Sequence, residues 1–530
     1  MTGARSASVP GNQRPTPIRL EPCGADFQPE ASPLGWSAWL PLGLAVSGIA
    51  FVCLACLPPG ICFGDHGELQ LAAASLGISH PPGYPVYVTL CHFATWIPGI
   101  DPPYAVSVAC LVGGLAGLLI CGMIQVRLGV NPWIAAASIV LLSLYPRVRL
   151  NLIAPEVYGL TLLFLAAAAY LLMRYAMPET RGGQRFSLPA LAALFFGIAS
   201  VSRPPILLAA PFFLAAWWLA GRRSQRPAPR RPRSLGCLIG FFLLPAVYSL
   251  AYLLIRDRPN TGYDYIENAS RTEQRLPPQE SGLGGRIDRA IWLATGRQFV
   301  GEVGIGSENV SRRVAWMIRD VSPYHPITFP LVAALTVAGA AIVFRRSVAA
   351  GLFLTGMAFQ SAAFVCVYPV HGQAADLMPL LFAGAICCGA VVSWAVARTG
   401  ALREVIAIAL FVAVSGGLAA SFRSNPCNPA WIDASGFAAG IDLAVLPANS
   451  VILATWSESI PLRYVQFVRT PRADVAVVTA RSTDWALEAR RYAARPLFAT
   501  RNPGDHLPEF DAIAMGGLWR LEKKPPSPSG

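Results

Sequence analysis

The sequence predicts an α-helical polytopic membrane protein with a small α/β domain at its C-terminal end. Of its 530 residues, 54% are hydrophobic and only 13% are charged, a composition too apolar for an ordinary soluble protein. Apolar runs long enough to cross a bilayer core of about 30 Å recur from Trp36 to Ala420. After that point, short strand candidates alternate with helical stretches. We therefore expect a membrane domain at 34–421 and an α/β domain at 422–530.

The apolar runs predict eleven membrane spans. They lie at 36–57, 104–126, 131–146, 152–173, 187–202, 205–220, 235–255, 327–344, 348–368, 377–397 and 403–421. Fourteen arginines lie in the connections on one side of these spans, against three in the short connections on the other side. Because positive residues mark the cytoplasmic side, we expect the N-terminus in the cytoplasm and the C-terminus outside it. Two large loops, 58–103 and 256–326, and the C-terminal domain then lie on the outer face.

The other global properties exclude several classes of protein. The formal net charge of +13 does not indicate nucleic-acid binding, because the arginines are placed as charges that flank membrane spans. The first 33 residues are polar and rich in Pro and Gly, so we expect a disordered cytoplasmic tail without a cleavable signal peptide. The twelve cysteines have neither zinc-site spacing nor the pattern of a disulfide framework, and we interpret them as packing residues.

The outer loop at 58–103 contains no Lys or Arg, yet it carries Asp65, His66 and Glu68 close together. An acidic residue followed three positions later by Glu, ahead of an apolar run, is the pattern of a capping box. Asp65 would then cap a helix, and Glu68 would return the bond. Alternatively, partial desolvation at a membrane surface would raise the pKa of a carboxylate and make it a better base. Capping does not exclude chemistry, so Asp65 and Glu68 are the candidate catalytic residues.

The segment SHPPGYPVY at 79–87 has a chain path that its prolines restrict. Pro82 and Gly83 fit the centre of a type II turn, and Pro85 can open the next helix. His80 is either a packed loop histidine or a polar contact to a substrate phosphate or sugar. Tyr84 is a candidate substrate-binding residue in the same segment.

A second acidic residue, Glu156, lies near the outer end of a predicted span beside Tyr158. A carboxylate in or near a span is a functional candidate by default. The alternative is that Glu156 is an ion-pair partner of Arg147 or Arg149. Glu156 and Tyr158 are therefore candidate substrate-binding residues.

Outer-face arginines complete the predicted site. The candidates are Arg147, Arg149, Arg203 and Arg256. A planar guanidinium binds phosphate in a bidentate manner, although each arginine alone is more simply a headgroup anchor. Together with the acidic loop, they fit transfer of a sugar from a polyprenyl phosphate. That reaction needs cations for the leaving phosphate and one carboxylate to take the acceptor's proton. The three residues Asp65, Glu68 and His80 could also hold a divalent cation, although no ligand spacing requires one.

The tail predicts alternating strands and helices. The strand candidates are VILAT at 451–455, VAVVTA at 475–480, PLFAT at 496–500 and a last strand in GGLWRLEKK at 516–524. Helical stretches lie between them, in SESIPLRYVQFVRT at 457–470 and STDWALEARRYAA at 482–494. This alternation is typical of a small α/β domain with a parallel sheet.

Several motifs resemble those of the transmembrane protein 260 O-mannosyltransferase family and its bacterial relatives, within the GT-C glycosyltransferases. They are Asp-x-Gly-Glu at 65–68, HPPGYP at 80–85, PEVYGL at 155–160 and the tail segment at 460–478. The resemblance covers most of residues 36–480. It implies a bacterial inner-membrane enzyme with a periplasmic active site and a lipid-phosphate sugar donor. It also implies that Asp65 is the catalytic base, with Glu68 beside it.

The chain departs from that family at two places. His66 stands where the family has a small residue, and the loop at 256–326 has only a faint likeness, in GYDYIENASRTEQ at 262–274. The second departure leaves the acceptor open as a protein, a glycan or a lipid. A transporter or flippase of a lipid-linked intermediate and a non-catalytic membrane scaffold are the alternatives. A transporter should show inverted repeats and broken helices at mid-membrane, and neither pattern is clear in the sequence.

Overall fold

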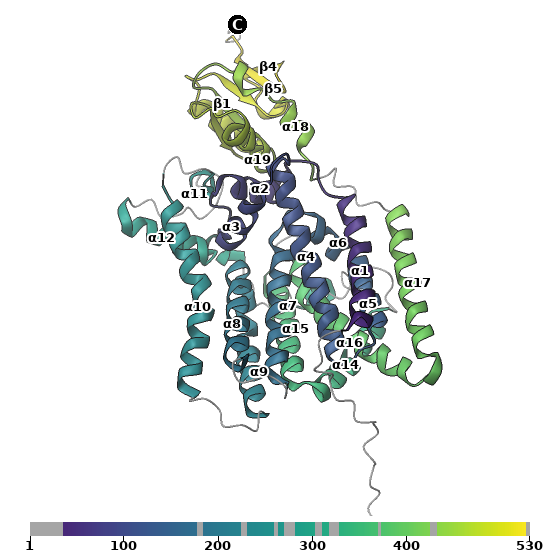
Figure 1. The fold of residues 1–530 in the computed structure, drawn as a ribbon. Helices are drawn as coiled ribbons and strands as arrows, with labels where there is room; N and C mark the ends of the chain where they lie inside the picture. The colour runs from purple at the N-terminus through teal and green to yellow at the C-terminus, as the bar shows by residue number, and fades with distance from the viewer. Residues whose placement is uncertain are drawn as a thin grey trace, which may run out of the picture.

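The computed structural model describes residues 35–177, 184–223, 231–258, 263–269, 281–302, 310–316, 328–368, 373–424 and 432–525. Figure 1 shows a bundle of long helices, with the C-terminal sheet mounted at one end of it. The predicted tail at 1–33, the last residues at 526–530 and much of the loop at 256–326 lie outside the described residues.

Each of the eleven predicted apolar runs coincides with a helix or helix pair. These are α1 (Trp36–Leu54), α4 (Pro102–Arg127), α5 (Pro132–Leu144) followed by α6 (Pro146–Ile153), α7 (Val157–Ala176), α8 (Gln184–Ser202), η1 (Pro204–Ala209) followed by α9 (Ala210–Arg223), α10 (Arg231–Arg256), α14 (Thr328–Arg346), α15 (Val348–Val367), η3 (Gln373–Leu377) followed by α16 (Met378–Ala397), and α17 (Arg403–Ser424). Within the described residues, eight helices are long and apolar enough to cross a membrane. The helices α5 and α6, which are bent by 82° relative to each other, add a ninth span if the two together form a single span. The predicted spans at 187–202 and 327–344, α8 and α14, are not among them.

Small residues allow the central helices to approach closely. A Cβ added at Gly159 on α7 would lie 2.9 Å from the carbonyl oxygen of Cys110 on α4. A Cβ at Gly117 would likewise lie 3.1 Å from Leu162. Since lipid tails are as apolar as leucine, such close packing is a main source of helix association in a bilayer. Helices α4 and α7 are thus closely packed against each other within the bundle.

The loop at 58–103 folds into two short helices, α2 (Gly64–Ser75) and α3 (Pro85–Ala94). Pro85 opens α3, as predicted. The capping-box interpretation is wrong, because the N-cap of α2 is Phe63 and no side chain caps it. The turn is also one residue earlier than expected: Gly83 N–H donates to the carbonyl of His80, which places Pro81 and Pro82 at its centre.

The C-terminal domain, residues 432–525, contains the predicted strands and helices. The predicted elements are β1 (Val451–Ala454), α19 (Trp456–Tyr464), β2 (Ala476–Thr479), α20 (Trp485–Arg491), β3 (Leu497–Ala499) and β5 (Leu518–Lys523), and the structure adds α18 (Ser435–Ala439) and β4 (Phe510–Met515). The strand order is β2-β1-β3-β5-β4. The three strands β2, β1 and β3 are parallel, as predicted, whereas β5 runs antiparallel to β3 and to β4. The sequence analysis did not identify β4.

The C-terminal domain packs on the first loop. Phe63 N–H donates to the carbonyl of Ile432, and Ala434 N–H donates to the carbonyl of Ile61. The fully buried side chain of Ile460 on α19 belongs to the same hydrophobic cluster as Leu69 on α2. On the other side of α2, the backbone of Ile78 pairs with Asp264, just before α11 (Tyr265–Ala269). Helix α12 (Gly282–Ala294) and η2 (Arg297–Glu302) follow nearby.

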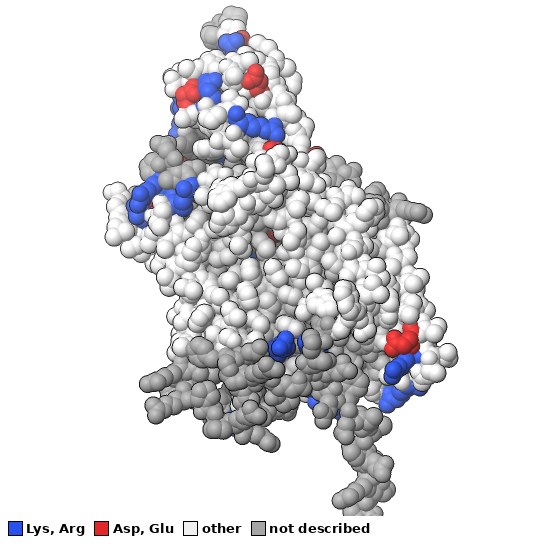
Figure 2. All heavy atoms as spheres, viewed as in Figure 1, with Lys and Arg blue, Asp and Glu red and all other residues white. Residues whose placement is uncertain are grey.

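Charged side chains are confined to the two ends of the bundle on the face shown in Figure 2. Lys, Arg, Asp and Glu gather over the C-terminal domain and α12, and again where α17 begins. The broad band between them is almost free of charge, as the apolar interior of a bilayer requires. The chain is therefore an integral membrane protein, as the sequence predicts.

Candidate active site

A cavity of about 990 Å³ lies where the helix bundle meets the C-terminal domain. This volume is at the upper end of the range typical of small-molecule sites. Its walls come from α2, the loop before α3, α6, the start of α7, η1, the end of α12 with η2, the end of α15, η3 and the start of α19. Seven of the ten predicted site residues line it: Asp65, His80, Tyr84, Arg147, Glu156, Tyr158 and Arg203.

Asp65 lies in the first turn of α2, with its carboxylate exposed to the cavity. Gly64, which precedes it, has a φ of +59°, so glycine suits the tight entry of the chain into α2. Asp65 Oδ1 accepts a hydrogen bond of 2.8 Å from Nε1 of Trp456. This carboxylate is thus held at one oxygen while the side chain remains open to the cavity.

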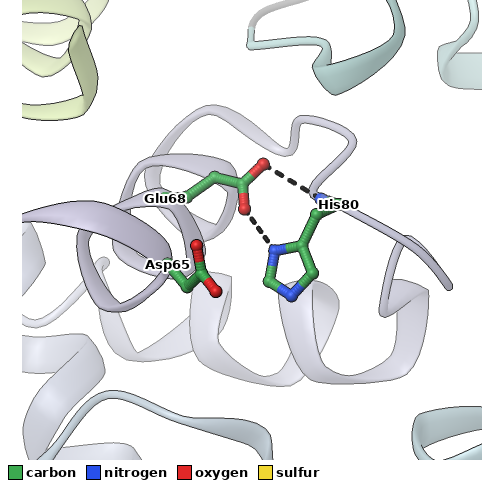
Figure 3. Close-up of side chains that lie close together, drawn as sticks. All are labelled: Asp65, Glu68 and His80. Carbon is green, nitrogen blue, oxygen red and sulfur yellow. Dashed lines mark hydrogen bonds and ion pairs between the residues drawn. The ribbon is translucent and has the colours of Figure 1, made fainter. Parts of the chain in front are cut away.

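Glu68, one turn later on α2, is fully buried. Its Oε1 accepts hydrogen bonds from the His80 backbone N–H, at 2.9 Å, and from the Tyr263 hydroxyl, also at 2.9 Å. Its Oε2 contacts His80 Nδ1. Figure 3 shows both links between Glu68 and His80, with the Asp65 carboxylate close to the His80 ring. Partial desolvation of a carboxylate in this loop was expected, and the structure buries Glu68 while Asp65 is exposed.

The charge of His80 is set by these carboxylates. Burial opposes the charge, but the adjacent Glu68 carboxylate outweighs it and raises the pKa of His80 to about 9. At neutral pH the imidazole is therefore protonated and ion-paired with Glu68. Neither predicted alternative for His80 is complete, because it is a packed loop residue whose ring also lines the cavity.

One donor atom from each of Asp65, Glu68 and His80 lies within 4.8 Å of the others. Two carboxylates and an imidazole are ligands that a divalent cation accepts. However, Glu68 and His80 are bonded directly to each other, and a ligating histidine must be neutral. A histidine that bonds a carboxylate through Nδ1 can still ligate a cation through Nε2, with Glu68 orienting the ring. The arrangement therefore fits a protonated His80 without a cation and a neutral His80 with one.

His66, the residue that departs from the family motif, forms a second histidine–carboxylate pair in the cavity. Its Nδ1 lies 2.9 Å from Oε1 of Glu156, the residue at the N-cap of α7. Burial opposes the charge of His66, but Glu156 outweighs it and raises the pKa. Glu156 was expected to contact either a substrate or one of Arg147 and Arg149. Its ion-pair partner is instead His66, the residue next to Asp65, and Glu156 also lines the cavity.

The arginines divide into two groups. Arg203 lines the cavity, forms an ion pair with Asp376 and lies 4.7 Å from the centre of the Tyr158 ring. Arg147 also lines the cavity and is exposed. Arg149 is buried and donates to the Ser421 hydroxyl on α17 at 3.3 Å. Of the predicted arginines, Arg147 and Arg203 therefore lie in the cavity, and Arg149 has a packing role.

Arg256, the remaining predicted arginine, does not line the cavity. Its Nη2 donates to the carbonyl of Ser75, the last residue of α2, at 2.9 Å. A cation at the C-terminal end of a helix binds its free carbonyls and complements its dipole. Arg256 thus supports the helix that carries Asp65 without reaching the substrate space.

The sequence analysis did not identify several polar residues of the cavity, among them Asp376, Trp456 and Ser457. Asp376 precedes an apolar run, so the signal used for Glu156 could have found it. Trp456 and Ser457 open a helix of the C-terminal domain, and nothing local in the sequence relates them to a loop some 390 residues earlier.

Comparisons with known proteins agree with the motifs. Residues 65–226 match the family model of the Protein O-mannosyl-transferase TMEM260 N-terminal domain. The matched region begins at Asp65. Protein O-mannosyl-transferase TMEM260 of Mus musculus is 30% identical over 167 residues, 31% of this chain and 23% of the relative. Its counterpart in Dictyostelium discoideum is 25% identical over 178 residues, 31% of this chain and 22% of the relative. The match thus spans less than a quarter of the length of these relatives.

The fold has its own counterpart among solved structures. ArnT from Cupriavidus metallidurans in the apo state superposes with a TM-score of 0.57, over 91% of this chain and 97% of that chain, at 12% identity. At that identity the likeness concerns the fold alone. Residues 65–226 are therefore similar to the TMEM260 O-mannosyltransferases, and the fold of the chain is similar to that of ArnT.

Proposed function

We propose that this protein is a membrane glycosyltransferase that moves a sugar from a polyprenyl-phosphate donor to an acceptor hydroxyl, with Asp65 as the general base. One observation carries the proposal: an exposed carboxylate and two arginines share a cavity whose rim is apolar and open. The relation to the O-mannosyltransferases supports the same reaction class.

The apolar rim is formed by η1. Leu207 and Leu208 line the cavity, yet their side chains are 47% and 44% exposed at the surface of the bundle. An exposed apolar surface on a membrane helix faces lipid. A prenyl chain in the bilayer can therefore contact η1 while its phosphate reaches Arg147 in the cavity. This placement explains why the donor would carry a long lipid.

Asp65 is a better candidate for the base than Glu68. Both oxygens of Glu68 are engaged by His80, one of them also by Tyr263, and the side chain is fully buried. Asp65 is exposed and has one hydrogen-bond partner among the described residues. Glu68 and His80 instead hold the loop that forms one wall of the cavity.

The reaction requires no redox partner. The acceptor oxygen attacks the anomeric carbon and forms the new glycosidic bond while the bond between that carbon and the phosphate oxygen breaks. The acceptor's proton passes to Asp65, and the polyprenyl phosphate leaves with its negative charge next to Arg147. General-base assistance of this kind contributes a factor of about 10²–10⁴.

We propose that the cavity faces the periplasm of a bacterial inner membrane. The C-terminal domain, α2 and α12 lie at one end of the bundle in Figure 1. The ends of α9 and α14 and the starts of α10 and α17, which border the arginine-rich connections, lie at the other end. The cytoplasmic bias of arginine places that second end in the cytoplasm.

Replacing Asp65 by Asn tests the proposal. Purified protein in proteoliposomes is given labelled polyprenyl-phosphate mannose, and alternative polyprenyl-phosphate hexoses in parallel. We expect D65N to lose at least about 100-fold in transfer rate, within the range of general-base catalysis. The control D505N removes an exposed carboxylate from the C-terminal domain and should leave the rate unchanged. A D65N rate equal to wild type would remove Asp65 as base, and lipid transport without sugar transfer would favour a flippase.

A further inference from the structure

We infer that Trp456 of the C-terminal domain positions the Asp65 carboxylate, so that the catalytic site is shared between the two domains. This inference rests on the proposed function of Asp65 and names a residue that acts through it. Trp456 Nε1 donates to Asp65 Oδ1 at 2.8 Å, and both residues line the same cavity.

The two imidazole rings near Asp65 pair with other carboxylates. His66 faces Glu156, and His80 faces Glu68. The indole of Trp456 is therefore the group that fixes the orientation of the Asp65 carboxylate within the described residues. An indole N–H is a neutral donor that cannot accept, so it holds one carboxylate oxygen without competing for the acceptor's proton.

Trp456 is itself held in place by an aromatic contact. Its ring meets that of Tyr265 edge to face, with centroids 5.8 Å apart and an interplanar angle of 83°. The Tyr265 hydroxyl hydrogen-bonds the Gln298 side chain at 3.2 Å. Edge-to-face aromatic pairs stabilise a fixed ring orientation. The loop between α10 and α14 thus contributes the second support for the indole.

The backbone position of Trp456 is fixed by the turn that joins β1 to α19. Thr455 and Glu458 form a capping box at the start of α19. Glu458 also accepts hydrogen bonds from Thr500, at 2.8 Å, and from Arg501 Nε, at 2.9 Å, both just after β3. The turn is therefore tied to two neighbouring parallel strands, at the edge where such sheets commonly present functional side chains.

The two helices that carry Asp65 and Trp456 are in direct contact. A Cβ added at Gly67 on α2 would lie 3.0 Å from Ile460 on α19 and 1.8 Å from the carbonyl oxygen of Cys62. Such close packing leaves little room for the helices to shift. The separation between the indole and the carboxylate is thus set by the interface between the domains, and the C-terminal domain becomes part of the catalytic apparatus.

The variant W456F tests the inference, because it keeps an aromatic ring and removes the N–H. We expect kcat for sugar transfer to fall about tenfold, with the KM for the lipid-linked donor within about twofold of wild type, since a misplaced catalytic group costs rate more than binding. In the D65N background, W456F should cause no further loss. The matched control is W485F, which alters a fully buried tryptophan of the same domain, whose Nε1 has no hydrogen-bond partner among the described residues.

A second readout does not depend on catalysis. The apparent melting temperatures of wild type, W456F, D65A and their double variant form a cycle, because Ala, unlike Asn, removes the acceptor of the indole N–H. A non-additive result is expected for two side chains in contact. Additive shifts together with a wild-type kcat for W456F would overturn the inference while the role of Asp65 stands. An inactive wild-type protein would instead refute the proposed function, and the thermal cycle would still decide whether the contact exists. An equal loss of kcat in W485F would also overturn the inference, because it would indicate a general loss of domain structure.

Discussion

The ion pair between Glu68 and His80 predicts how the stability of the protein depends on pH. Glu68 is fully buried, the His80 side chain is 17% exposed, and the two are in direct contact. The substitution Glu68→Gln keeps the shape and an acceptor oxygen but removes the negative charge. His80 would then lose the carboxylate that it contacts directly and keep only the weaker charges of Asp65 and Glu156 nearby, so its pKa should fall.

The magnitude follows from the pKa of His80, which rises from 6.5 to about 9 in the folded protein. A folded-state pKa above the unfolded value means that the folded protein binds the proton more tightly. The stabilisation is complete below pH 6.5 and is lost as pH rises toward 9. At 1.36 kcal/mol for each pKa unit, the raised pKa of His80 contributes about 3 kcal/mol at pH 6, and the burial that raises the pKa of Glu68 offsets part of this gain. The E68Q variant should lack this contribution.

The assay is thermal unfolding of the detergent-purified protein between pH 6 and pH 9.5. We expect the apparent melting temperature of the wild type to fall over this range and that of E68Q to be lower and flatter, so that the two curves converge near pH 9. The control E522Q alters an exposed glutamate paired with Arg520 on β5, and it should follow the wild type. An E68Q curve that runs parallel to the wild-type curve would refute the assigned proton on His80.

Two further predictions concern the cavity and the orientation. Arg147→Ala should raise the KM for the lipid-linked donor roughly tenfold or more, the value of one charge-assisted hydrogen bond, with little change in melting temperature. Arg149→Ala should lower the melting temperature and leave the KM for the donor unchanged, because Arg149 is buried against Ser421. Equal effects of the two substitutions on KM would contradict the different roles assigned to these arginines. Alkaline phosphatase fused after residue 430 should be active in bacterial cells, and an inactive fusion with a cytoplasmic C-terminus would reverse the proposed orientation.

Much of the fold could be predicted from the sequence because its signals are local. An apolar run of about twenty residues must form a helix in a bilayer, since backbone groups have no other partners there. All eleven predicted runs are helices or helix pairs, although only eight or nine are candidate spans in the part of the chain that the structure describes. Strands β1, β2 and β3 also follow from short apolar runs, whereas β4 escaped notice because its residues alternate and are largely exposed.

The candidate site could be predicted only in part. Asp65, His80 and Glu156 are marked by local features: acidic residues in an outer loop, rigid turns and a carboxylate at a span end. The residues that these side chains contact are not marked by any local feature of the sequence. The spacing of Asp65 and Glu68 suggested a capping box, yet the tertiary fold turns Glu68 toward His80 and Tyr263 instead.

The sequence by itself therefore determined the membrane helices, the α/β tail and the loop that carries the acids, because hydropathy and turn chemistry act between near neighbours. Only the tertiary structure decided which acid is buried, which arginines reach the cavity and which indole meets Asp65. Asp65 and Trp456 lie 391 residues apart, and a hydrogen bond at that separation depends on how two domains pack. Packing is a property of whole surfaces, and no short stretch of sequence records it.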